Sequence, residues 1–304
     1  MMLKNIKIIL VGSIASLILS SCDKDLSTPE FEVSTRSTTF KKGELITFNI
    51  SGNPDVIRFY SGEQGKKYEF SRRDSLKGKL LLQFSTFAQN SGSQENSLKI
   101  LYSTDFKGAY NIAGVQAATW NDVTSKAILS NGTDNVPSGQ IDLTNIVPAT
   151  GPVYFAFRKR DEQSATQKPR AWTIRSFQLN LLNEQDNFSY PLTDLTNAGW
   201  TAVDVLNSTY RWAINLTATS PALSIGGGNI NTAANEDWVI TKVLYPNAIK
   251  PDPAIPVKGV DTKVESYSYS FATPGVYKLA FVASNMTPDK QKEVVKELEL
   301  TITD

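Results

Sequence analysis

Residues 267–285 read YSYSFATPGVYKLAFVASN, and residues 40–52 read FKKGELITFNISG. In both stretches, short runs of alternating or contiguous apolar residues are bounded by glycine, proline, asparagine or serine. That pattern is typical of β-strands joined by turns. No stretch of the sequence sustains the 3.6-residue apolar period of an amphipathic helix, so the sequence predicts an all-β protein.

The same pattern extends over the rest of the chain. Further strands are predicted at Val56–Tyr60, Leu98–Tyr102, Val153–Phe157 and Trp172–Leu182, among others. Residues 288–297 (PDKQKEVVKE) have a helix-forming composition, but the segment is short and follows a predicted strand. We therefore expect a long charged hairpin loop or a single helical turn there.

Composition excludes several classes of protein. The chain has 304 residues, 31 basic and 30 acidic, which gives a net charge of +1 and no basic footprint for nucleic acid. It contains no histidine, which rules out Ser-His-Asp catalysis and histidine-ligated metal sites. The single cysteine rules out intrachain disulfides and thiolate clusters.

The two ends of the chain each carry part of the strand-and-turn pattern of one small β domain. In residues 31–75, Gly43-Glu44 introduces a strand that ends in a Ser-Gly turn, and in residues 251–304 two tyrosines precede the turn at 273–277. These segments resemble the opening and closing halves of a PKD-like immunoglobulin β-sandwich. Neither has enough strands to close a sandwich, whereas together they supply about 100 residues, the size of one such domain. We predict one sandwich split in sequence by an inserted domain; two separate small domains are the alternative.

The middle of the chain, residues 76–250, is predicted to form the inserted domain. Residues 98–106 (LKILYSTDF), 118–124 (ATWNDVT), 153–158 (VYFAFR) and 235–240 (NEDWVI) resemble strands of β jelly rolls in secreted bacterial modules. The chain as a whole resembles a family of Bacteroidetes surface lipoproteins encoded beside starch-utilisation-type importers. The resemblance implies a non-catalytic protein whose partners are a glycan ligand and an outer-membrane importer complex.

The N-terminus has the features of an export signal. Residues 1–21 combine two lysines with a short apolar run, as in a signal peptide, and Leu19-Ser20-Ser21-Cys22 resembles a bacterial lipobox. This implies lipidation of Cys22, with residues 22–30 as a tether. Asp23-Lys24-Asp25 resembles the acidic export signal of surface lipoproteins. We therefore expect a lipid-anchored protein in the outer membrane, facing the cell exterior.

Aromatic residues are the strongest candidates for ligand contacts, because sugar rings present apolar C–H faces that stack on aromatic planes. Trp200 follows a turn and is predicted to be exposed. Tyr110 lies in a long loop predicted over 105–119, and Trp120 lies beside turn residues. The other three tryptophans, Trp172, Trp212 and Trp238, fit core positions.

Arginine side chains supply the predicted hydrogen-bond donors. Residues 158–162 (RKRDE) with 168–170 (KPR) are expected to build a charged, solvated hairpin. Arg158 and Arg160 in this hairpin could bind hydroxyl or carboxylate groups beside an aromatic platform.

Acidic residues leave two minor possibilities open. A pair of carboxylates is the only catalytic apparatus that the composition still allows, so a glycoside hydrolase or lyase is one alternative function. No catalytic residue is assigned, and no cofactor is expected beyond a possible structural calcium ion held by Asp105, Asp122 and Asp142. An adhesin that contacts other proteins is the other alternative, which an apolar patch or a bare sheet edge would favour.

Overall fold

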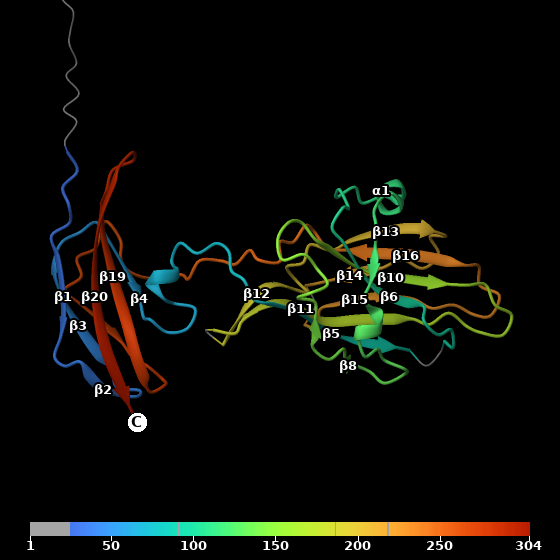
Figure 1. The fold of residues 1–304 in the computed structure, drawn as a ribbon, viewed down its shortest axis with the longest axis horizontal. Helices are drawn as coiled ribbons and strands as arrows, with labels where there is room; N and C mark the ends of the chain where they lie inside the picture. The colour runs from blue at the N-terminus through green and yellow to red at the C-terminus, as the bar shows by residue number, and fades with distance from the viewer. Residues whose placement is uncertain (1–24, 90–91, 186, 218) are drawn as a thin grey trace, which may run out of the picture. The chain divides into compact units, whose positions relative to one another are not determined.

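The computed structural model describes residues 25–89, 92–185, 187–217 and 219–304, and nearly all of its regular structure is β-strand (Figure 1). The predicted all-β sandwich fold is confirmed. The chain forms two compact units, one of residues up to Glu63 together with Ala254–Asp304, the other of Gln64–Pro253. The predicted signal peptide and Cys22 lie outside the described residues. Within those residues, no helix is long and apolar enough to cross a membrane.

The first unit contains two sheets, with strand orders β1-β3-β18 and β17-β4-β19-β20-β2. Strands from both ends of the chain are neighbours in each sheet: Phe48 pairs with Tyr267, and Phe59 pairs with Phe281. The strands are β1 (Phe31–Thr35), β2 (Thr39–Lys41), β3 (Ile46–Gly52), β4 (Val56–Tyr60), β17 (Ile255–Lys258), β18 (Ser266–Tyr269), β19 (Gly275–Met286) and β20 (Gln291–Thr303).

Aromatic rings fill the core of the first unit. Strand β3 alternates strictly, with Ile46, Phe48 and Ile50 buried, as expected for a strand with one face on a core. The ring centroid of Phe48 lies 5.8 Å from that of Phe59 and 5.2 Å from that of Phe281. The core therefore consists of side chains from both ends of the chain, and neither end could bury its own apolar face alone.

The expectation of a charged loop or helical turn at 288–297 is wrong. Strand β20 begins at Gln291 and pairs with β19 along its whole length, from Met286↔Gln291 to Gly275↔Ile302. A short turn joins the strands, with the Thr287 N–H donating to the Lys290 carbonyl at 2.8 Å. Charged residues suit this strand because most of its side chains are exposed or half-exposed.

The predicted domain boundary at residue 75 is also wrong, because residues 64–75 belong to the second unit. Their backbone groups bond to a segment near the end of that unit. The Ile249 N–H donates to the Asp74 carbonyl at 3.0 Å, and the Asp252 N–H donates to the Phe70 carbonyl at 3.2 Å. Residues 64–75 thus pair with residues 247–252 of the same unit.

The second unit also contains two sheets. One has the order β13-β16-β10-β6-β7; the other has the order β14-β15-β11-β5-β8, with β12 beside β11 and β9 beside β5. The elements are η1 (Tyr68–Phe70), β5 (Lys79–Ala88), β6 (Leu98–Ser103), α1 (Ile112–Ala117), β7 (Asn121–Asp122), η2 (Thr124–Lys126), β8 (Val136–Pro137), β9 (Ile141–Asp142), β10 (Tyr154–Asp161), β11 (Trp172–Asn183), β12 (Phe188–Asp194), β13 (Thr201–Leu206), β14 (Ala213–Asn215), β15 (Ala222–Ile225) and β16 (Asn235–Ile240).

Strand β10 shows how the five-stranded sheet uses its two faces. Phe155 and Phe157 join the large core between the two sheets. Tyr154 and Ala156 point to the opposite, outer face and belong to a separate apolar cluster. Arg158 follows with the same parity as these two residues, so it also lies on the outer face.

Candidate functional site

The segment between β6 and β7 packs onto the outer face of the five-stranded sheet and carries α1, as Figure 1 shows. Part of the predicted loop 105–119 is therefore helical. The Asn111 side chain caps α1 by accepting from the Gly114 N–H at 2.9 Å. Val115 is buried against the sheet, and the Tyr110 hydroxyl donates to the Thr241 carbonyl at 3.0 Å. These contacts hold the segment in one position on a rigid sheet.

Trp120 ends this segment as a half-buried ring. Its Nε1 donates to the Val115 carbonyl at 3.0 Å. The ring centroid lies 5.4 Å from that of Phe106 and 5.0 Å from that of Trp238 in β16. Trp238 is only 5% exposed, so Trp120 is the accessible ring of this tryptophan pair.

Charged residues continue the same face beyond the tryptophans. Arg158 of β10 lies opposite Trp238 in β16 and opposite Lys99 in β6. The Arg158 Cζ lies 5.7 Å from the centroid of the Trp238 ring. We call the set formed by Lys99, Tyr110, Trp120, Asp122, Arg158, Arg160, Glu236 and Trp238 the Trp120 face.

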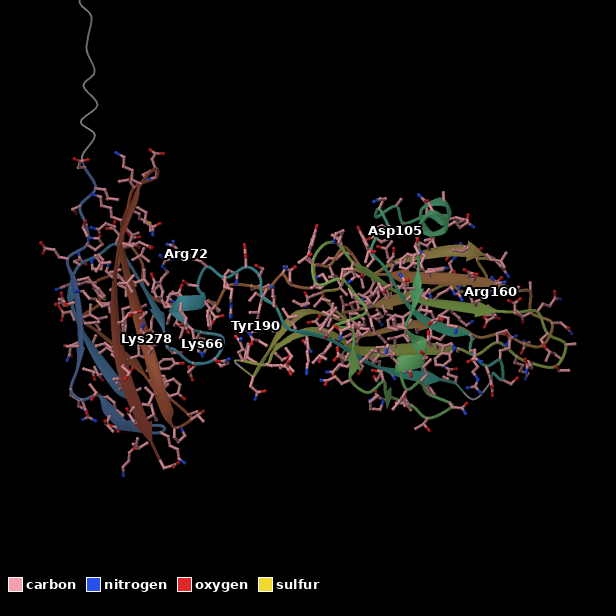
Figure 2. The ribbon with its side chains drawn as sticks, viewed as in Figure 1. Lys66, Arg72, Asp105, Arg160, Tyr190 and Lys278 are labelled. Carbon is pink, nitrogen blue, oxygen red and sulfur yellow. The ribbon has the colours of Figure 1, made fainter. Side chains whose placement is uncertain are left out.

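The acidic groups of the Trp120 face have defined partners. Glu236 accepts from Trp238 Nε1 at 2.9 Å and from Arg160 Nη1 at 3.0 Å. Asp122 lies 3.1 Å from Lys99 Nζ, and its other oxygen accepts from the Thr124 N–H. Figure 2 labels Arg160 on this sheet and Asp105, which begins the segment near α1.

Four of the five predicted ligand contacts therefore lie on one face: Tyr110, Trp120, Arg158 and Arg160. The expected charged hairpin is only in part a solvated loop, because Arg158, Lys159, Arg160 and Asp161 belong to β10 and Lys159 is fully buried. Trp238, expected to be a core residue, is buried as expected, in the apolar cluster on the outer face of the sheet. Alternation could not have separated the two faces of β16, since all six of its residues are buried.

The expected exposure of Trp200 is wrong. Trp200 is 7% exposed and belongs to the core between the sheets. Its ring centroid lies 5.7 Å from that of Phe157 and 5.0 Å from that of Phe177. Its Nε1 donates to the Leu195 carbonyl at 2.8 Å, which satisfies its polar atom inside the protein.

The aspartates considered for calcium do not come together as a ligand set. Asp105 accepts from the Thr119 N–H at 2.8 Å at the far end of its loop, whereas Asp142 caps a local turn by accepting from the Thr144 N–H at 2.9 Å. In the part of the chain that the structure describes, no group of three or more acidic or cysteine side chains is arranged to hold a metal ion.

A buried charged cluster lies on the inner face of the five-stranded sheet. Lys159, Asp161 and Asp237 are each at most 1% exposed, and Lys159 forms an ion pair with Asp161. Asp237 lies opposite both Lys159 and Asp204. Burial and a hydrogen bond with the Asp204 carboxyl raise the pKa of Asp237 to about 8.

We expect Asp237→Asn to change how stability depends on pH. The pKa of Asp237 is raised on folding, so its contribution to stability is complete below about pH 4 and is lost as pH rises toward 8. Asn at this position keeps the hydrogen bonds and removes the titration. Between pH 4 and pH 8 the free energy of unfolding of the variant should therefore rise relative to that of wild type, by on the order of several kcal/mol. Urea unfolding over this range measures it; parallel stability curves for the two proteins would contradict the assignment.

Comparison with known proteins gives one match. The family described as "Domain of unknown function (DUF5017)" matches residues 21–200, which is more than half of the chain and extends across parts of both units. No curated protein and no solved structure matches. The matched segment includes six of the eight residues of the Trp120 face: Lys99, Tyr110, Trp120, Asp122, Arg158 and Arg160. The chain is a member of the DUF5017 family.

Proposed function

We propose that this protein is a non-catalytic, cell-surface glycan-binding lipoprotein that captures oligo- or polysaccharide for an outer-membrane importer. The observation that carries the proposal is the Trp120 face. It combines an accessible indole with guanidinium and carboxylate groups on one sheet.

The chemistry of the face suits a sugar. The apolar C–H side of a pyranose ring can stack on Trp120, while its hydroxyls meet the donors of Arg158 and Arg160. The supporting contacts of Trp120 with Val115, Phe106 and Trp238 fix the ring before any ligand arrives. A preformed platform lowers the entropic cost of binding.

The proposed anchor is compatible with the fold. Strand β1 begins at Phe31, so a lipid on Cys22 would leave eight residues before the first sandwich. Such a tether spans at most ~30 Å when fully extended. The first unit would then stay close to the membrane surface, and the inserted unit would carry the binding site.

The charge on β20 gives little support to the adhesin alternative. Strand β20 pairs with β2 only at Thr301–Thr303. The rest of that edge of β20 carries the charged residues Lys292, Glu293, Lys296, Glu297 and Glu299. Charged residues on a sheet edge discourage addition of a strand from another chain.

We expect Trp120→Ala to lose glycan binding by roughly tenfold to a hundredfold, by analogy with the ~1–3 kcal/mol that an aromatic platform gives a stacked nucleic-acid base. Affinity electrophoresis in gels containing a panel of neutral and acidic polysaccharides measures the loss. Trp120→Phe, which keeps a ring, should retain a larger share of binding.

Phe87→Ala is the matched control, because Phe87 is a half-buried aromatic residue in β5 of the other sheet. It should bind like wild type. Circular dichroism must show that each variant is folded. A folded Trp120→Ala protein with unchanged glycan retention would remove the Trp120 face from consideration.

A further inference from the structure

Arg158 is the one cation on the Trp120 face that lacks an acidic partner. Lys99 pairs with Asp122 at 3.1 Å, and Arg160 pairs with Glu162 at 2.7 Å and with Glu236 at 3.0 Å. Within the described residues, Arg158 makes neither an ion pair nor a hydrogen bond, and its Nε is buried without a partner. A guanidinium keeps its charge at every physiological pH, so the face holds a permanent unpaired positive charge.

The neighbouring acids already have other partners. Both oxygens of Glu236 are in use, one by Trp238 Nε1 and the other by Arg160. Both oxygens of Asp122 are in use as well, one by Lys99 and the other by the Thr124 N–H. The surrounding residues therefore leave Arg158 available to an external anion.

The position of Arg158 strengthens the attraction of its charge for an anion. Its side chain is half-buried between its cross-strand neighbours Lys99 and Trp238, and its guanidinium packs near the Trp238 ring. Contact with an aromatic ring fixes the plane of the guanidinium, and partial burial reduces screening by water. A guanidinium held in this way presents a two-pronged donor to a carboxylate or a sulfate.

We propose that Arg158 is the anion-binding residue of the Trp120 face and that the glycan bound there carries a carboxylate or sulfate group. This inference rests on the proposed glycan-binding function and narrows it to acidic glycans. One sugar ring stacks on Trp120, and an anionic substituent on that ring or its neighbour pairs with Arg158.

A glycan array of matched pairs tests the proposal. Each uronate polymer, such as polygalacturonate, is printed beside its carboxyl-reduced form, and each sulfated polymer, such as chondroitin sulfate, beside its desulfated form. The full-length protein should bind acidic members and lose at least tenfold in affinity for their neutralised counterparts. Whether carboxyl reduction or desulfation abolishes binding tells which anion is recognised.

Two substitutions connect the result to the residue. Arg158→Gln should weaken binding of the acidic glycan about tenfold to a hundredfold and flatten its dependence on salt concentration. Arg158→Lys keeps the positive charge but lacks the two parallel N–H donors of a guanidinium. Its affinity for the acidic glycan should lie between those of wild type and Arg158→Gln. Arg175→Gln is the control, because Arg175 pairs with Asp134 on the other sheet and should leave binding unchanged.

The outcomes separate this inference from the function on which it rests. Binding of neutral and acidic members alike, lost in Trp120→Ala but kept in Arg158→Gln, would overturn the role of Arg158 and leave glycan binding intact. An array with no bound glycan would overturn both proposals.

Discussion

A chain that ends at Pro253 is expected to keep its second unit folded and to lose the first unit completely. Strands β1 to β4 would lose their partners β17 to β20, and Phe48 and Phe59 would lose contact with Phe281. A few strands without an opposing sheet are marginal in water, so residues 25–63 should become sensitive to protease. Limited proteolysis with mass spectrometry identifies the protected fragment.

The matched control for this truncation is a chain of residues 64–253, which lacks both ends. It should unfold at the same temperature as the second unit of the truncated protein. Protease resistance of residues 25–63 in the chain that ends at Pro253 would show that the N-terminal strands fold without the C-terminal ones.

Trp200→Ala is expected to destabilise the second unit by about 3–5 kcal/mol, because it removes a large buried ring from the space between Phe157 and Phe177. Urea unfolding monitored by circular dichroism measures the change. Trp200→Phe should lower the free energy of unfolding by less, because it keeps an aromatic ring. It loses part of the ring volume and the hydrogen bond to the Leu195 carbonyl.

Glycan binding gives this prediction a second readout. Trp200 lies inside the sandwich, whereas the Trp120 face lies on the outer side of the sheet. Trp200→Ala protein that remains folded at low temperature should bind glycan normally. Normal stability combined with lost binding would mean that Trp200 contacts the ligand.

Much of the fold follows from local pattern. Alternation in β3 and the apolar run in β19 indicate strands directly, because one face of β3 and the centre of β19 are buried. The domain boundary at residue 63 cannot be predicted from local pattern, because residues 64–75 are held in the second unit by backbone hydrogen bonds to residues near 250. The second half of β20, residues 298–302, is predictable as a strand, but its first half is not, because the charged residues of 291–297 are exposed or half-exposed, where composition says little about backbone conformation.

The site was predictable in part for a similar reason. Tyr110 and Trp120 lie near turns, and turns bring side chains to the surface. Trp200 also follows a turn, but it lies directly before β13, whose pairing with β16 directs the indole into the core. Local sequence carries no information on that choice, because it depends on a strand 35 residues away.

The bonds that join the two ends of the inserted unit bear on how the protein reaches its folded state. The Lys67 N–H donates to Asp252 at 2.8 Å, so the folded insert holds its two ends close together. Without this, the halves of the first sandwich would have to meet across a flexible loop of about 190 residues. Folding of the insert replaces that loop with a short one and reduces the entropic cost of closure by on the order of 2–3 kcal/mol. The inserted unit thus prepares the assembly of the sandwich that flanks it, which makes an early-folding insert and a late-folding sandwich the favoured order.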